Sequence, residues 1–195
     1  MGANLISPSD GTIVRWRIVG ATGGPFYLRV LTPVVGTTYT GAGTGPAQTP
    51  STNGTETFPA NLPIRAGQIV GFDNANNSDM FGLKISAGAT YTDWNPALAD
   101  GATLPYTNPY GANGEIGFNA DVRYCVVPAL TGTKIGAARQ ALTAADCAVG
   151  KISRPTNKAR RKKAKFVRAV SAVAGSSISD TAPIDLVLGK KGHKK

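Results

Sequence analysis

The charged residues divide this chain of 195 residues into two parts of opposite character. Residues 1–124 carry six Lys/Arg and eight Asp/Glu, a net charge of −2, whereas residues 125–195 carry fifteen Lys/Arg and three Asp/Glu, a net charge of +12. A change this abrupt predicts two modules with different surfaces. We therefore expect one domain at residues 1–124 and a second at 125–189, followed by a disordered basic tail at 190–195.

The composition favours strands and turns over helices. Only 16% of the residues are charged, while the chain holds 24 Gly and 13 Pro. Helical bundles and coiled coils need Glu, Lys and Arg on their exposed faces, so they do not fit. No stretch approaches the roughly 20 apolar residues that span a bilayer. The first residues lack the basic and apolar regions of a signal peptide, which leaves a cytoplasmic protein or a mature exported chain behind a new Met.

Short alternating apolar segments predict an all-β first module. In residues 12–19, Val14, Trp16 and Ile18 share one face of a strand, and Trp16 is expected in the core. A second strand at 26–31 should stop at Pro33. Further strands are expected at 55–58, 68–72, 81–86 and 114–122.

Clusters of Gly, Pro and Asn separate these strands, which is typical of a β-sandwich with jelly-roll-like character. The segments 36–53 and 87–113 are rich in Gly, Thr and Pro. We expect both of them to form long surface loops.

The second module has a different pattern. Thr133 is predicted to N-cap a helix that extends to about Ala145, with Ala138 and Leu142 on its apolar stripe. Asp146 follows at the position where a positive φ is expected. Strands are expected at 147–152, 166–173 and 184–188. Together these elements predict a small α+β domain of β-α-β-β order.

Six sequence features of the second module, in the right order, resemble a PASTA domain, a small module of bacterial penicillin-binding proteins and Ser/Thr kinases. They are Val127-Pro128, Leu130-Thr131-Gly132, Ala137–Leu142, Val149–Ile152, Ser171–Gly175 and Ile184–Gly189. The resemblance covers residues 126–189, about a third of the chain. The chain departs from the family at Ala172, where Pro is frequent, and in a basic run between the two middle strands.

The first module resembles, less specifically, the Gly/Thr-rich β-sandwich domains that precede such modules in actinobacterial exported proteins. The resemblance implies a non-catalytic, exported protein of the cell envelope. It also implies that the PASTA-like module recognises peptidoglycan or an associated anionic wall polymer. A structural surface protein without a small ligand is the alternative.

The chain has two cysteines, Cys125 and Cys147. A β-α-β arrangement could bring the starts of two strands together and pair them in a disulfide. Closing a loop of about 20 residues would add roughly 3 kcal/mol of stability. Two buried free thiols are the alternative. A disulfide would indicate an oxidising compartment, which agrees with the extracellular or cell-surface location that the resemblance implies.

Residues 154–165 hold seven Lys/Arg and no acid. Such density attracts polyanions by releasing their counterions, although a basic run can also be a solvated hairpin that adds only solubility. Nucleic acid is a less favoured partner, because only Phe166 offers a ring for base stacking. The candidate anion-binding residues are Lys151, Arg154, Lys158, Arg160, Arg161, Lys162, Lys163 and Lys165.

A group of aromatic and polar residues in the 87–113 segment suits sugar rings, which offer C–H faces and hydroxyl edges. The candidate sugar contacts are Tyr91, Asp93, Trp94, Tyr106 and Tyr110. Alternatively, these rings plug one end of the sandwich.

The sequence gives little basis for catalysis or metal binding. His193 is the only histidine and lies in the tail, and nothing indicates that Asp93 and Asp100 are held as a catalytic pair. Residues 73–79 are rich in oxygen ligands but do not match a calcium-binding helix–loop–helix motif, which leaves an irregular calcium loop or a polar turn. We therefore expect no enzymatic activity, no cofactor and no metal.

Overall fold

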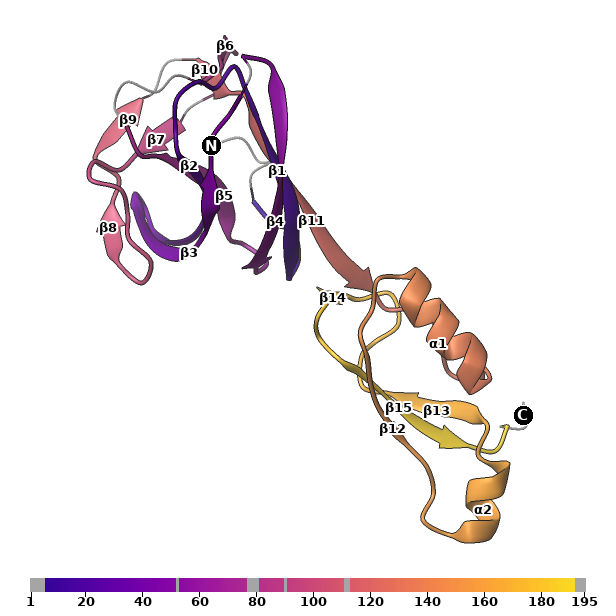
Figure 1. Ribbon diagram of the computed structural model, residues 1–195. Helices are drawn as coiled ribbons and strands as arrows, with labels where there is room; N and C mark the ends of the chain where they lie inside the picture. Colours follow the sequence, from indigo (N-terminus) through magenta and orange to yellow (C-terminus); the bar gives the residue numbers. More distant parts are fainter. Residues whose placement is uncertain (1–5, 52, 77–80, 90, 111–112, 192–195) are drawn as a thin grey trace. The chain divides into compact units, whose positions relative to one another are not determined.

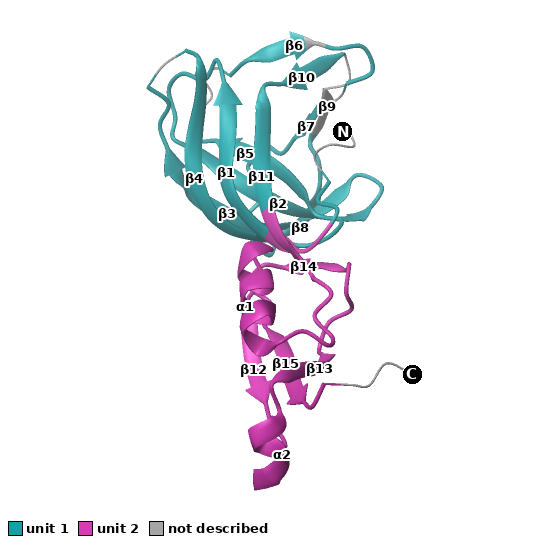
Figure 2. Ribbon diagram, turned by 90° about the vertical axis from the view of Figure 1, so that its right-hand side faces the viewer, with its two compact units in different colours: residues 1–8, 12–122 teal, residues 9–11, 123–195 magenta. Residues whose placement is uncertain are grey.

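The computed structural model describes residues 6–51, 53–76, 81–89, 91–110 and 113–191, and most of its regular structure is β-strand. It divides into two compact units (Figure 2): unit 1 comprises residues 1–8 and 12–122, and unit 2 comprises residues 9–11 and 123–195. The change of unit falls after Val122, two residues before the boundary expected from charge. No helix among the described residues is long and apolar enough to cross a membrane.

Unit 1 is built from antiparallel strands (Figure 1). Strands β4, β1 and β11 are neighbours in one sheet, and a second sheet has the order β5-β2-β3-β8. Unit 1 also contains two separate two-stranded sheets, β6 with β10 and β7 with β9. The bounds are β1 Gly11–Val19, β2 Phe26–Val35, β3 Thr38–Gln48, β4 Thr55–Ile64, β5 Ile69–Asn74, β6 Leu83–Ile85, β7 Tyr91–Asp93, β8 Thr103–Pro105, β9 Asn108–Tyr110, β10 Gly114–Ile116 and β11 Phe118–Val126.

The main core of unit 1 takes side chains from both sheets. Trp16 on β1 is fully buried, which confirms its predicted core position. Its ring centroid lies 5.0 Å from that of Phe58 on β4 and 5.9 Å from that of Phe118 on β11. Phe26 and Leu28 on β2 supply buried side chains from the other sheet. Alternation along β1 and β2 therefore places one apolar face of each sheet in the same core.

The prediction of two long surface loops in unit 1 is wrong. Strand β3 occupies most of residues 36–53, and β7, β8 and β9 lie within 87–113. The glycines of β3 are the reason, since they allow neighbouring atoms to approach its backbone closely. A Cβ on Gly41 would lie 2.3 Å from the Ala99 carbonyl oxygen, and one on Gly45 would lie 3.2 Å from Leu28 Cβ. Here a Gly-rich sequence allows a strand to be closely covered.

Strand β2 does not stop at Pro33 but continues to Val35. Beyond Leu31 it no longer pairs with β5 and pairs only with β3. Proline lacks a backbone N–H, and a strand with a partner on one side alone tolerates that loss. The expected end of the strand was wrong for this reason.

Unit 2 contains helix α1, Ile135–Ala144, and a three-stranded sheet of order β12-β15-β13. Strand β15 (Ile184–Gly189) runs parallel to β12 (Val149–Ser153) and antiparallel to β13 (Phe166–Val170). The strands expected after the helix are therefore present. Two elements were not expected: helix α2, Lys158–Lys163, and the three-residue strand β14, Ser177–Ser179, which pairs with the end of β11.

Helix α1 buries Ala138 and Leu142, as its apolar stripe predicts. The expected N-cap is wrong. Lys134 occupies that position without a side-chain cap, and the Thr133 hydroxyl instead donates to the Leu130 carbonyl oxygen at 2.7 Å. At the other end, Asp146 has φ +53°, which confirms the predicted left-handed residue after the helix.

Cys125 and Cys147 form a disulfide, as predicted. Both are buried in the core of unit 2, together with Val127, Leu130 and Leu142. The expected placement of the pair was wrong, however. Cys125 lies near the end of β11, whose partner in unit 2 is β14, and Cys147 lies between α1 and β12. The disulfide therefore ties the end of β11 to the α1–β12 connection instead of joining the starts of two strands.

Candidate functional site

The cationic segment, residues 154–165, connects β12 to β13 and contains the short helix α2, where no helix was expected. Asn157 caps α2, because its Oδ1 accepts hydrogen bonds from the backbone N–H groups of Ala159 (3.0 Å) and Arg160 (3.2 Å). The exit is fixed by Ala164, which is 1% exposed in the core of unit 2. The views agree that α2 extends past the end of the three-stranded sheet (Figures 1 and 2).

All seven cations of the cationic segment are exposed, and none forms an ion pair within the described residues. Two of the four acids of unit 2 are engaged elsewhere. Asp180 is 2.7 Å from Arg123 Nε, and Asp185 Oδ1 accepts from the Lys151 backbone N–H at 2.6 Å. Of the other two, Asp146 follows α1 and Asp10 precedes β1. The positive charge of the segment is therefore not compensated by these carboxylates.

The helix α2 tolerates this charge only at a cost. Lys158 and Lys162 lie four residues apart on one face, and like charges at that spacing destabilise a helix by about 0.2–0.5 kcal/mol. Cations in its last turn partly offset this through the helix dipole. An anion bound along α2 would remove the repulsion and stabilise the helix.

The other predicted anion contacts lie on the flanks of this helix. Lys151 is on β12, Arg154 follows β12, and Lys165 precedes β13; all three are exposed. Arg168 on β13, which was not among the predicted contacts, is also exposed. The alternation there would have shown it, because Val167 is fully buried and the next residue of a strand points to the opposite face.

A second feature of unit 2 is a shallow pocket of about 320 Å³. It is apolar, and the Thr131 hydroxyl is the single polar side-chain group among its lining residues. It lacks the charged groups that an anionic ligand requires. The lining residues are Pro128, Ala129, Leu130, Thr131, Val170, Ala172 and Ala174.

The candidate sugar contacts of unit 1 lie on or near the paired strands β7 and β9. Trp94 packs edge-on against Tyr39, with ring centroids 5.4 Å apart, and Tyr106 packs against the same small core. Tyr91 and Asp93 lie on β7. The side chain of Tyr110 lies outside the described residues, although its backbone pairs with Tyr91.

Asp73 belongs to the candidate calcium loop and Asp100 to the candidate catalytic pair. Both form ion pairs with Arg29. The Arg29 guanidinium lies 2.5 Å from Asp73 and 3.0 Å from Asp100, and the whole residue is 5% exposed. Residues 77–79 of that loop lie outside the described residues. In the part of the chain that the structure describes, no three His, Cys, Asp or Glu side chains gather as metal ligands.

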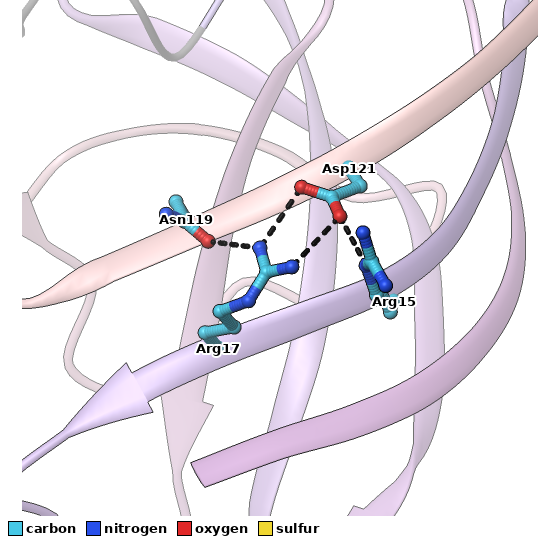
Figure 3. A network of polar contacts seen from close by, with 4 residues as sticks. All are labelled: Arg15, Arg17, Asn119 and Asp121. Atoms are coloured by element: carbon cyan, nitrogen blue, oxygen red, sulfur yellow. Dashed lines mark hydrogen bonds and ion pairs between the residues drawn. The ribbon is translucent and has the colours of Figure 1, made fainter. Parts of the chain in front are cut away.

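An exposed polar network joins β1 and β11 (Figure 3). Asp121 accepts two hydrogen bonds of 2.9 Å from Arg17 and a third from Arg15 Nε, and Arg17 also donates to Asn119 Oδ1 at 3.1 Å. These two guanidinium groups lower the pKa of Asp121 from 3.8 to about 2.

We expect Asp121→Asn to lower the unfolding free energy of unit 1 by about 0.5 kcal/mol at neutral pH, because a partly exposed ion pair is screened by solvent. The folded pKa is depressed, so this contribution is present above pH 3.8 and is lost as the pH falls towards 2. Denaturant unfolding should therefore separate the two proteins at pH 7 but much less at pH 2. An equal difference at both pH values would contradict the ion-pair account.

A scan against models of protein families found no match to this chain, and searches of curated proteins and of solved structures found none either.

Proposed function

We propose that this chain is a non-catalytic, exported binding protein of the bacterial cell envelope, whose unit 2 contacts an anionic wall polymer associated with peptidoglycan. The observation that carries the proposal is the cationic segment: seven exposed Lys/Arg without an ion pair among the described residues, held on a disulfide-linked scaffold. The resemblance of residues 126–189 to a PASTA domain supports the same partner.

The chemistry favours an extended polyanion. Helix α2 presents five cations in six residues and buries none of them, so it has no apolar face for insertion into lipid. Repeated phosphate or carboxylate groups along a polymer match this spread of charge better than a single small anion does. The disulfide supports an exported location, since such bonds persist in oxidising compartments.

Co-sedimentation with purified, insoluble cell walls tests the proposal. We expect retention at low salt by walls that carry teichoic acid and a marked loss of retention from walls stripped of it, with soluble DNA as a competitor. Retention by stripped walls at high salt would assign the binding to peptidoglycan itself. Absence of retention under every condition would contradict the proposal and favour a structural surface protein.

A further inference from the structure

We propose that unit 1 carries a binding site of its own, for a neutral saccharide, in an open pocket of about 460 Å³ lined by residues of β1, β4, β6, β10 and β11. This inference is independent of the polymer contact proposed for unit 2. It also places sugar recognition away from Trp94 and Tyr106, the candidates suggested by the sequence.

The floor of the pocket is main chain, fixed by a closed ring of three hydrogen bonds. The Val19 N–H donates to the Gly117 carbonyl (2.8 Å), the Gly117 N–H to the Gly82 carbonyl (2.8 Å), and the Gly82 N–H to the Val19 carbonyl (2.7 Å). A Cβ on Gly82 would lie 2.7 Å from the Val19 oxygen, and one on Gly117 would lie 2.8 Å from Val19 Cβ. Both positions therefore require glycine, and the N–H and carbonyl groups of this ring satisfy one another.

Apolar side chains continue this floor and remain open to solvent. Leu83 is 53% exposed and Val19 is 40% exposed, and Ile116 and Phe118 line the pocket beside them. Tyr91 and Leu83 both lie close to Gly114. A Cβ built on Gly114 would stand 3.0 Å from Tyr91 Cε1 and 3.3 Å from Leu83 Cδ1. Of the candidate sugar residues, Tyr91 is thus placed beside the pocket.

The polar groups at the rim are varied, and each charged one lies beside a charge of opposite sign; Arg17 pairs with Asp121 at 2.9 Å. Lys84 and Glu115 face each other in the register of β6 and β10, and both are exposed without an ion pair among the described residues. Asn119 uses its Oδ1 to accept from Arg17, so its amide hydrogens are left for a ligand. Thr55 adds a hydroxyl at the start of β4.

This combination matches a sugar ring better than an anion. A pyranose offers an apolar C–H face for the floor and hydroxyl groups that both donate and accept, as the rim groups require. Glu115 opposes the ammonium of Lys84 and Asp121 opposes the guanidinium of Arg17, so a polyanion gains little net attraction here. Binding at this site should therefore be insensitive to salt, unlike binding at the cationic segment.

Amide chemical-shift mapping of the full chain tests this site, with four neutral tetrasaccharides as probes: cello-, chito-, manno- and maltotetraose. We expect at least one to bind with a millimolar dissociation constant. Its shift changes should be confined to β6, β10, the start of β11 and the end of β1, and should be equal at low and high salt.

The variant Glu115→Ala/Asn119→Ala should bind about tenfold more weakly, since it loses an acceptor and a donor at the rim. Asn61→Ala, an exposed change on β4 away from the pocket, is the matched control and should bind as the parent does. Absence of shifts with all four sugars, equal binding by the double variant, or binding that weakens with salt would each overturn the proposal.

Discussion

Replacing Cys125 and Cys147 together by alanine is expected to lower the unfolding free energy of unit 2 by about 3 kcal/mol. The bond closes a loop of 22 residues, and loop-closure entropy in the unfolded chain gives an effect of this size. Unit 2 is small and has a thin core, so this is a large share of its stability. Hydrogen exchange of the α1 amides measures the change directly, because these amides report on unit 2 alone.

The parent protein treated with a reductant provides the control, since it breaks the bond without removing the sulfur atoms. It should show the same acceleration of exchange in α1, while amides of β1 and β2 in unit 1 keep their protection. Unchanged exchange in both the variant and the reduced parent would contradict the stabilising role of the bond.

Exchanging the five cations of α2 for glutamine should weaken binding to soluble wall teichoic acid by at least about a hundredfold at low salt. The negative slope of log affinity against log salt should also become shallower by about 3–4, because each phosphate contact that is lost no longer releases a counterion. Isothermal titration over a range of salt concentrations gives both quantities. The substituted positions are Lys158, Arg160, Arg161, Lys162 and Lys163.

The matched control keeps every charge and exchanges each of these lysines for arginine and each arginine for lysine. It should retain the affinity of the parent within about threefold, because diffuse attraction depends on charge more than on side-chain geometry. All five positions are exposed, so neither variant should change the unfolding free energy by more than about 0.5 kcal/mol. Parent-like affinity in the glutamine variant would show that α2 is only a solvated surface.

Periodicity in the sequence was sufficient to predict much of the fold. Alternation placed Trp16 in the core, the spacing of Ala138 and Leu142 gave the buried stripe of α1, and Asp146 marked the end of that helix. The glycine content of residues 36–53 led to a wrong prediction of a loop, because the glycines of β3 are needed for tertiary contacts. Gly41 lies in β3 because Ala99 covers it closely, and no local pattern reveals a contact between residues so far apart in the sequence.

The candidate sites divide in the same way. The cationic segment is continuous in sequence, so its charge could be predicted, although the cap that makes it helical depends on Asn157 alone. The pocket of unit 1 could not be predicted, because Val19, Gly82 and Gly117 meet only when three separate chain segments pack together. A continuous run of charge can be read from the sequence, whereas a pocket floor built from distant main-chain segments cannot.

Hydrogen–deuterium exchange of the full chain, with and without purified wall teichoic acid at low salt, tests whether the cationic segment contacts the wall polymer. We expect slower exchange in α2 and the flanking residues of 154–165, since the bound polyanion removes the repulsion between Lys158 and Lys162 and stabilises the helix. The effect should vanish at high salt. Unchanged exchange in α2, or protection confined to unit 1, would contradict the assignment of the cationic segment as the site that contacts the wall polymer.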